Sequence, residues 1–279
     1  MSQCLLVAQI QHSLGRIMKS YSLKAILLIA SILLASTAKL YSASGEADPI
    51  KVDWSFKGVT GKFDRASLQR GFQVYKEVCS SCHSMQYLSY RNLGEPGGPE
   101  FSEQEVKAIA ASVEITDGPD DQGEMFTRPG RPADKFKNPY PNVKASTAAN
   151  GGAYPPDMSV LVKARPGGSN YIYSVLVGYE DPPSGMTLDD GVYYNKYMIG
   201  NKIKMSSPLS DDIVEYSDGT QASVDQMAKD VTTFLSWAAE PELEERHRTG
   251  VKVIIYLILL TTLVYLSMKK IWSRVDTEV

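Results

Sequence analysis

The stretch that decides the fold is Cys79-Ser80-Ser81-Cys82-His83. Two cysteines three positions apart, followed directly by a histidine, form the attachment signature of a c-type haem. The spacing has a physical reason, because one helical turn presents both sulfur atoms to the two vinyl groups of a porphyrin while the adjoining imidazole reaches the iron. The sequence therefore predicts a domain built around a covalently bound haem, with His83 as an iron ligand.

Two other kinds of site use the same pair of thiols. A Cys-x-x-Cys pair also serves as half of a zinc site or as a redox dithiol. A zinc site needs further ligands, and beyond the motif the chain offers only Cys4, His12 and His247. A thioredoxin-like dithiol needs a surrounding βαβ pattern, which the sequence does not show. Haem attachment is the interpretation that this shortage of other ligands favours.

The N-terminal segment indicates export. An apolar run of 11 residues, 25–35, follows Lys19 and Lys24, and a small-x-Ala cleavage pattern comes next at 36–38. This combination is typical of a secretory signal peptide, and the run is too short to span a bilayer. We predict that residues 1–38 are an N-terminal extension and a cleaved signal peptide.

The C-terminal segment is long enough to span a membrane. Residues 251–268 carry one charge, Lys252, and this length of helix covers about 27 Å. A basic and aromatic flank follows, which suits a cytoplasmic interface. We predict a periplasmic c-type haem domain over 39–250, a transmembrane helix over 251–268 and a cytoplasmic tail over 269–279, in the inner membrane of a bacterium.

The predicted exported domain is acidic. Residues 39–250 hold 22 Lys and Arg against 30 Asp and Glu, a net charge of −8. Such a surface suggests a basic protein partner whose association weakens as salt rises, and it argues against nucleic acid as a partner. A merely soluble acidic surface has the same composition, so this alternative stays open.

Two amphipathic helices are predicted, one at each end of this domain. Residues 64–83 carry apolar side chains at helical spacing, with Asp64 as N-cap, and run into the haem motif. Residues 223–240 begin at Ser223, which would form a capping box with Gln226. The second helix ends because a proline follows.

The segment between these helices, 95–208, is rich in Gly and Pro, with short helical or strand candidates such as 102–113 and 170–177. Gly71 is costly inside a helix and therefore predicts that the first helix crosses the second closely, as in cytochrome c. The predicted fold is mainly α: a cytochrome c-like haem domain with long irregular insertions, plus one C-terminal transmembrane helix.

The second axial ligand decides the chemistry of such a haem. Methionine suits a high-potential electron carrier, histidine lowers the potential, and an open position permits reactions with gases or peroxide. His247 lies in a charged run beside the membrane span and is interpreted as a solvated interface residue. The methionine candidates are Met125, Met158, Met186, Met198 and Met205. Met205 has context in its favour, because it lies in a short loop before the terminal helix, where cytochromes c place their methionine.

Several separate blocks, all in one order, carry a resemblance to a known family. They are RGFQVY at 70–75, CSSCHSM at 79–85, DGP at 117–119 leading to GEMF at 123–126, NGGAYPPD at 150–157, VYYN at 192–195, and AKD at 228–230 through WAAEP at 237–241. The chain resembles the cytochrome c1 family, the haem subunits of cytochrome bc1 complexes of the alphaproteobacterial and mitochondrial type. The resemblance covers nearly the whole exported domain and extends into the anchor.

The resemblance implies roles for matching residues. Cys79 and Cys82 would carry the thioethers, His83 would be the proximal ligand and Met205 the distal ligand. Arg165 matches an arginine that pairs with a haem propionate, with an exposed surface arginine as the alternative. The acidic run falls where the family presents carboxylates to cytochrome c, with a solvated acidic loop as the alternative; it comprises Glu114, Asp117, Asp120, Asp121 and Glu124.

Two departures from the family pattern concern rigidity. The usual Met-Ala-Pro-Pro is here Met205-Ser206-Ser207-Pro208, so the ligand loop is expected to be less rigid. The additional disulfide that many bacterial members carry in the long insertion is not possible here, because no cysteines remain for it. Both departures bear on the midpoint potential rather than on the role of the chain.

The implied function is electron transfer within a cytochrome bc1 complex. The subunit would accept electrons from the Rieske iron–sulfur protein and pass them through a His/Met haem c to cytochrome c, beside cytochrome b in a dimeric membrane complex. It would not be an enzyme on its own. One alternative is an independent membrane-tethered c-type cytochrome delivering electrons to an oxidase. Another is an enzyme with an open haem iron, such as a peroxidase.

Overall fold

The computed structural model describes residues 47–275. The predicted signal peptide at 1–38 lies outside the described residues, as do 39–46 of the predicted haem domain and the last residues of the predicted tail. Within 47–275 the chain forms six α-helices, three short 3-10 helices and two small antiparallel sheets. The prediction of a mainly helical fold is confirmed.

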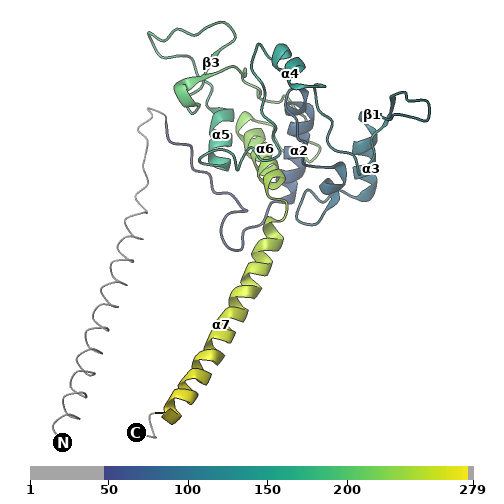
Figure 1. Ribbon diagram of the computed structural model, residues 1–279. Helices are drawn as coiled ribbons and strands as arrows, with labels where there is room; N and C mark the ends of the chain where they lie inside the picture. The colour runs from purple at the N-terminus through teal and green to yellow at the C-terminus, as the bar shows by residue number, and fades with distance from the viewer. Residues whose placement is uncertain (1–46, 276–279) are drawn as a thin grey trace, which may run out of the picture. The chain divides into compact units, whose positions relative to one another are not determined.

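Helices α2 (Arg65–Glu77) and α6 (Val224–Ala239) organise the core and cross side by side, as Figure 1 shows. Gly71 of α2 lies at the crossing. A Cβ atom there would lie 2.1 Å from the carbonyl oxygen of Asp230 and 2.8 Å from the Cβ of Phe234. The close crossing that Gly71 predicts is therefore confirmed, and the atom nearest to the glycine belongs to the α6 backbone.

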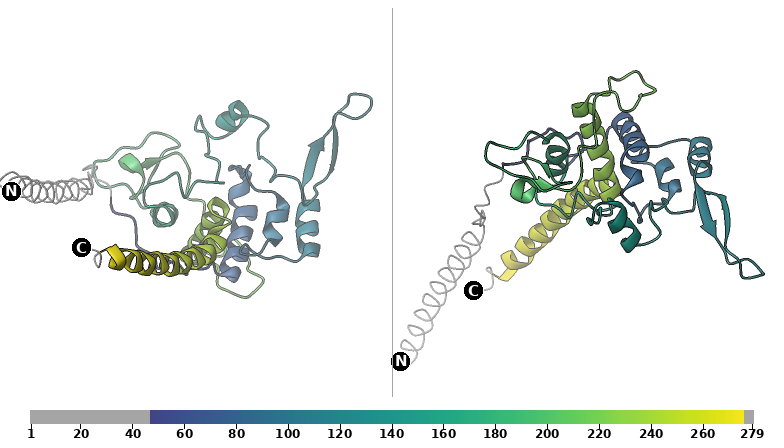
Figure 2. Two further views of the ribbon diagram at one scale, coloured as in Figure 1. Left: turned by 60° about the horizontal axis from the view of Figure 1, so that its bottom comes forward. Right: turned by 90° about the horizontal axis from the view of Figure 1, so that it is seen from above.

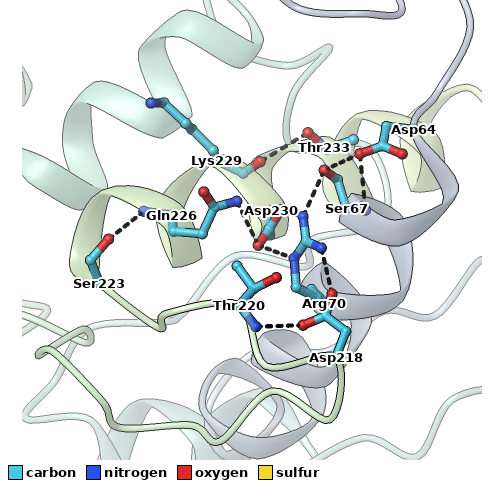
Figure 3. Close-up of polar contacts among 10 residues, drawn as sticks. All are labelled: Asp64, Ser67, Arg70, Asp218, Thr220, Ser223, Gln226, Lys229, Asp230 and Thr233. Atoms are coloured by element: carbon cyan, nitrogen blue, oxygen red, sulfur yellow. Dashed lines mark hydrogen bonds and ion pairs between the residues drawn. The ribbon is translucent and has the colours of Figure 1, made fainter.

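A buried ion pair ties the same two helices together. Figure 3 shows Arg70 of α2 reaching Asp230 of α6, with Nε–Oδ2 at 2.8 Å and Nη2–Oδ1 at 3.1 Å. A third guanidinium nitrogen donates to Asp218 at 2.8 Å. The Asp230 side chain is only 1% exposed, so the forked guanidinium supplies the charge that a buried carboxylate requires. The hydrogen bond to Asp230, with help from Asp218, raises the pKa of Arg70.

The predicted starts of the two helices are correct, and the predicted end of the first is wrong. Asp64 caps α2 by accepting from the Ser67 amide. The helix then ends at Glu77, and a 3-10 turn, η1 (Cys79–Ser81), replaces it at the haem motif. The backbone bonds of the motif therefore include both a 3-10-type bond, from the Cys82 amide to Cys79, and an α-type bond, from the His83 amide to Cys79.

The capping box predicted for α6 is only half formed. Ser223 accepts from the amide of Gln226, as a capping residue should. The Gln226 side chain donates to Asp230 at 3.1 Å instead of returning to the backbone of Ser223. The buried Asp230 carboxylate thus accepts hydrogen bonds from side chains of both helices.

Shorter elements surround this pair. They are η2 (Tyr90–Gly94), α3 (Glu103–Ala111), α4 (Val143–Ala149), α5 (Ser169–Val177) and η3 (Ile199–Asn201). α3 falls within the predicted candidate 102–113, and α5 matches the candidate 170–177 but begins one residue earlier, whereas α4 was not predicted. Strand β1 (Glu114–Asp117) pairs with β2 (Phe126–Pro129), and β3 (Tyr193–Tyr194) pairs with β4 (Lys202–Ile203). Figure 2 shows the β1–β2 hairpin extending beyond α3, and α5 packs against α6.

The last helix, α7 (Leu243–Val275), is long and apolar enough to cross a membrane. It begins upstream of the predicted boundary at 251 and continues past 268. The polar residues at 243–250 therefore belong to the same helix as the apolar run. The two boundaries remain predictions.

The first turns of α7 are bound to the first residue of α2 and to the loop that precedes it. The Glu244 carboxylate accepts from Arg65 through both oxygens at 2.8 Å, and from the Phe63 amide at 2.9 Å. His247 lies with Nδ1 3.0 Å from the carbonyl oxygen of Gly61. His247 is half-buried and makes this contact, so it is only partly exposed to solvent.

Candidate functional site

The haem motif forms one compact turn directly after α2. The amides of Cys82 and His83 both donate to the carbonyl oxygen of Cys79, at 3.1 and 2.9 Å. Cys79 is buried and Cys82 is half-buried. Burial, with a smaller contribution from Cys82, raises the pKa of the Cys79 thiol to about 12. The turn thus holds the two thiols and the imidazole on one short piece of backbone.

The imidazole of His83 is oriented by a backbone carbonyl. Its Nδ1 lies 2.9 Å from the oxygen of Pro156, and since a carbonyl only accepts, Nδ1 carries the proton. Burial lowers the pKa of His83 in spite of the opposing hydrogen bond and the nearby Asp157. The ring is therefore neutral, with the lone pair on Nε2. This is the state in which a histidine binds a metal while a second contact fixes its tautomer.

The loop that carries Pro156 is joined tightly to the chain after the motif. Asp157 accepts from the Ser84 hydroxyl at 2.7 Å and from the Gln86 amide at 3.0 Å, while the Met158 amide donates to the Ser84 carbonyl at 2.8 Å. Burial raises the pKa of Asp157, but hydrogen bonds led by that from Ser159 outweigh it and hold the pKa below its ordinary value. An ionised Asp157 therefore fastens the carbonyl that orients His83.

Replacing Asp157 by Asn is expected to remove an acid-sensitive part of the stability. A carboxyl with a lowered folded-state pKa contributes stability above its ordinary pKa of about 3.9, and that contribution is lost as pH falls through the folded value. Asp157→Asn should lower the unfolding temperature at neutral pH and show a smaller further drop on acidification than the parent protein. Thermal unfolding of holoprotein at neutral and acid pH measures both; Asp121→Asn, on the exposed hairpin, is the control. Parallel acid profiles for parent and Asp157→Asn would contradict this role.

Met205 is half-buried and is linked to the same loop through its neighbour. The Lys204 ammonium donates to the carbonyl oxygen of Gly151 at 2.9 Å, and the chain from Gly151 continues to Pro156. The backbone oxygen of Met205 accepts from the Tyr179 hydroxyl at 3.1 Å. The segment carrying Met205 therefore contacts the start of the loop whose other end orients His83.

The other methionine candidates have different surroundings. Met158 is buried, and its amide bonds the chain directly after His83. Met198 is half-buried and accepts from the Tyr171 hydroxyl at 3.3 Å. Met125 is 61% exposed on the β1–β2 hairpin, and Met186 is half-buried in the long insertion.

Arg165 lies in the turn before α5 and is half-buried. Its guanidinium donates to the carbonyl oxygen of Ala164 at 3.2 Å, and no described contact brings it to Cys79, Cys82 or His83. The same turn is tied to the end of α6, because Lys163 forms an ion pair with Glu240 at 2.5 Å. The structure thus brings together the motif residues, links Met205 to them through a shared loop, and leaves Arg165 outside their direct contacts.

The acidic run forms much of the β1–β2 hairpin, and two of its carboxylates serve the hairpin itself. Asp117 pairs with Arg128, which lowers the pKa of Asp117, and Asp120 accepts from the amides of Gln122 and Glu124 at 2.9 Å. The remaining members, Glu114, Asp121 and Glu124, have exposed side chains. A basic partner would therefore meet fewer carboxylates than the five of the acidic run in the sequence.

The donor set fits a covalently attached haem. It offers two closely spaced thiols, a neutral imidazole whose orientation is fixed, and a methionine loop on a neighbouring segment. Within residues 47–275, no group of three or more His, Cys, Asp and Glu is placed to share a metal ion. Sequence reasoning missed Asp157 and Tyr179; the only signal for Asp157 was its position in the 150–157 block.

Comparison with known proteins gives one family. A model described as the Cytochrome C1 family matches residues 54–275. A cytochrome c1 of Rhodospirillum rubrum is 46% identical over 268 residues, covering 90% of this chain and 97% of that protein. A cytochrome b/c1 of Bradyrhizobium diazoefficiens is 47% identical over 276 residues, covering 91% of this chain and 40% of that protein.

Mitochondrial proteins are equally similar. A protein of Arabidopsis thaliana named "Cytochrome c1 2, heme protein, mitochondrial" is 50% identical over 222 residues, covering 79% of this chain and 71% of that protein. A protein of Candida albicans named "Cytochrome b-c1 complex catalytic subunit, mitochondrial" is 49% identical over 227 residues, covering 81% of this chain and 76% of that protein. The match therefore spans most of the described residues, including the haem motif and α7.

Proposed function

Because the chain belongs to the cytochrome c1 family, whose members carry covalently bound haem c, we propose that it is the electron-transfer subunit of a cytochrome bc1 complex. It would accept electrons from the Rieske iron–sulfur protein and deliver them to cytochrome c. The observation that carries the proposal is the turn at 79–83, where the Pro156 carbonyl fixes the orientation of the His83 imidazole.

Each site residue has a distinct task in this proposal. Cys79 and Cys82 would hold the haem through thioether bonds, and His83, through Nε2, and Met205 would supply the two protein ligands of the iron. Arg165 offers a guanidinium for pairing with a propionate. The bound haem supplies a one-electron redox centre. The protein residues fix its ligands and limit the solvent around it, so the subunit makes and breaks no substrate bonds.

The proposed position follows from α7 and the predicted signal peptide. α7 anchors the subunit in the inner membrane of a bacterium, with the haem domain in the periplasm and the tail in the cytoplasm. Cytochrome b and the Rieske protein are the proposed partners within a dimeric complex. Glu114, Asp121 and Glu124 on the hairpin are the carboxylates proposed to meet a basic cytochrome c, with an attraction that weakens as salt rises.

The deciding experiment is quinol reduction in the detergent-solubilised, affinity-purified assembly. Haem reduction by a ubiquinol analogue should be fast and should be abolished by a quinol-site inhibitor, with b-type haems and an iron–sulfur protein co-purifying. A haem protein that purifies alone and ignores quinol would instead be a tethered shuttle to an oxidase. Carbon monoxide binding by the reduced protein would indicate an open iron and would favour the peroxidase alternative.

A further inference from the structure

The loop that carries Met205 is fastened by side chains from outside it. This loop lacks the proline pair expected from the family pattern, because Ser206 and Ser207 follow the methionine. The Tyr179 hydroxyl donates to the carbonyl oxygen of Met205 at 3.1 Å. One hydrogen bond thus fixes the backbone of the methionine itself.

Tyr179 is in turn anchored to α5 and to the β3–β4 hairpin. It forms an isolated β-bridge with Asn195, and the amide of Lys196 donates to the Gly178 carbonyl at 2.9 Å. Asn195 is fully buried; its amide nitrogen donates to the Val175 carbonyl of α5 at 2.8 Å. Tyr179 therefore connects α5 and the β3–β4 hairpin to the backbone of Met205.

A second contact fixes the same loop. Lys204 reaches the Gly151 carbonyl at 2.9 Å, but this bond is exposed to solvent. An exposed contact of a long, flexible side chain contributes less than a part-buried hydroxyl bond. Tyr179 is therefore expected to be the stronger of the two anchors.

We propose that Tyr179 is a positioning residue that holds Met205 within reach of the haem iron. This inference rests on the proposed function, and specifically on Met205 as the distal ligand. A hydrogen bond at the carbonyl restrains the Cα from which the thioether extends. Without it, the loop samples arrangements in which the sulfur is off the iron, and an external ligand then competes more effectively.

Imidazole titration of the ferric full-length holoprotein in detergent tests this role. A neutral hydrogen bond of this kind contributes about fivefold to an equilibrium constant. Tyr179→Phe should therefore bind imidazole about fivefold more tightly than the parent protein, with a weaker methionine-to-iron charge-transfer band. Tyr193→Phe, which removes a hydroxyl from the exposed end of the same hairpin, should match the parent. Lys204→Ala should give a smaller change than Tyr179→Phe.

The outcomes separate this inference from the proposed function. If the parent shows the methionine band and Tyr179→Phe leaves both band and imidazole affinity unchanged, the positioning role is overturned while the ligand assignment survives. A lower unfolding temperature with unchanged affinity would mean a purely structural tyrosine and would also overturn it. A parent protein without the methionine band overturns Met205 as ligand and this inference with it.

Discussion

Gly71→Ala is expected to destroy the packing of α2 against α6. The added Cβ would lie 2.1 Å from the carbonyl oxygen and 2.6 Å from the carbonyl carbon of Asp230. Both are backbone atoms, so no side-chain rotation can relieve the overlap and the helices must move apart. Separation would loosen the buried contacts around Phe72 and Phe234, and we expect a cost above about 3 kcal/mol, a large part of the stability of an ordinary domain.

Two further glycines allow the expected losses of stability to be ranked. At Gly98 a Cβ would meet the buried indole of Trp237 at 2.8 Å, so Gly98→Ala should cost less than Gly71→Ala because the neighbouring atom belongs to a side chain. At Gly250 a Cβ would meet nothing within 4 Å, and Gly250→Ala should be neutral or slightly stabilising. Thermal unfolding of the three holoproteins gives the order, and a parent-like unfolding temperature for Gly71→Ala would refute the argument.

Met205→Leu is expected to lower the midpoint potential of the haem by a few tenths of a volt. The choice of axial ligands spans about 0.8 V in haem proteins, and loss of a thioether removes the ligand that favours the reduced state. Leucine is close to methionine in volume but cannot bind iron, so the loop can still pack around it. Redox titration measures the potential, and carbon monoxide binding by the reduced variant reports the opened iron.

Met198→Leu provides a matched control for this substitution. Met198 is also half-buried and lies on the connection between β3 and β4, but its sulfur accepts from the Tyr171 hydroxyl. The same chemical change there should leave potential and spectrum as in the parent. If Met198→Leu shifts the potential while Met205→Leu does not, the distal ligand has been assigned to the wrong methionine.

Local signals in the sequence predicted much of the fold. Asp64 and Ser223 mark the starts of α2 and α6 because a capping side chain bonds an amide within one turn of itself. Gly71 predicted the crossing because glycine destabilises a helix interior, and close approach of another backbone is a common reason for glycine at such a position. The haem motif was visible because its three reactive side chains lie within five residues.

The parts that sequence reasoning missed depend on partners far along the chain. Asp157 bonds Ser84 across 73 positions, and nothing near Asp157 indicates which residue it will meet. Asn195 looks like an ordinary turn residue until its side chain is seen buried against Val175. Asp117 and Asp120 read as free charges, because their partners appear only when the β1–β2 hairpin closes.

The crossing of α2 with α6 also constrains the order of events during folding. The two helices come from opposite ends of the domain, and their ion pair joins residues 160 positions apart, so the core closes only after nearly the whole domain is available. Cys79 and Cys82 belong to the early part of the chain. Once the core has closed, Cys79 is buried and its thiol is hard to ionise, so its reactivity as a nucleophile is low. The folded architecture therefore favours covalent haem attachment to a chain that has not yet closed its core.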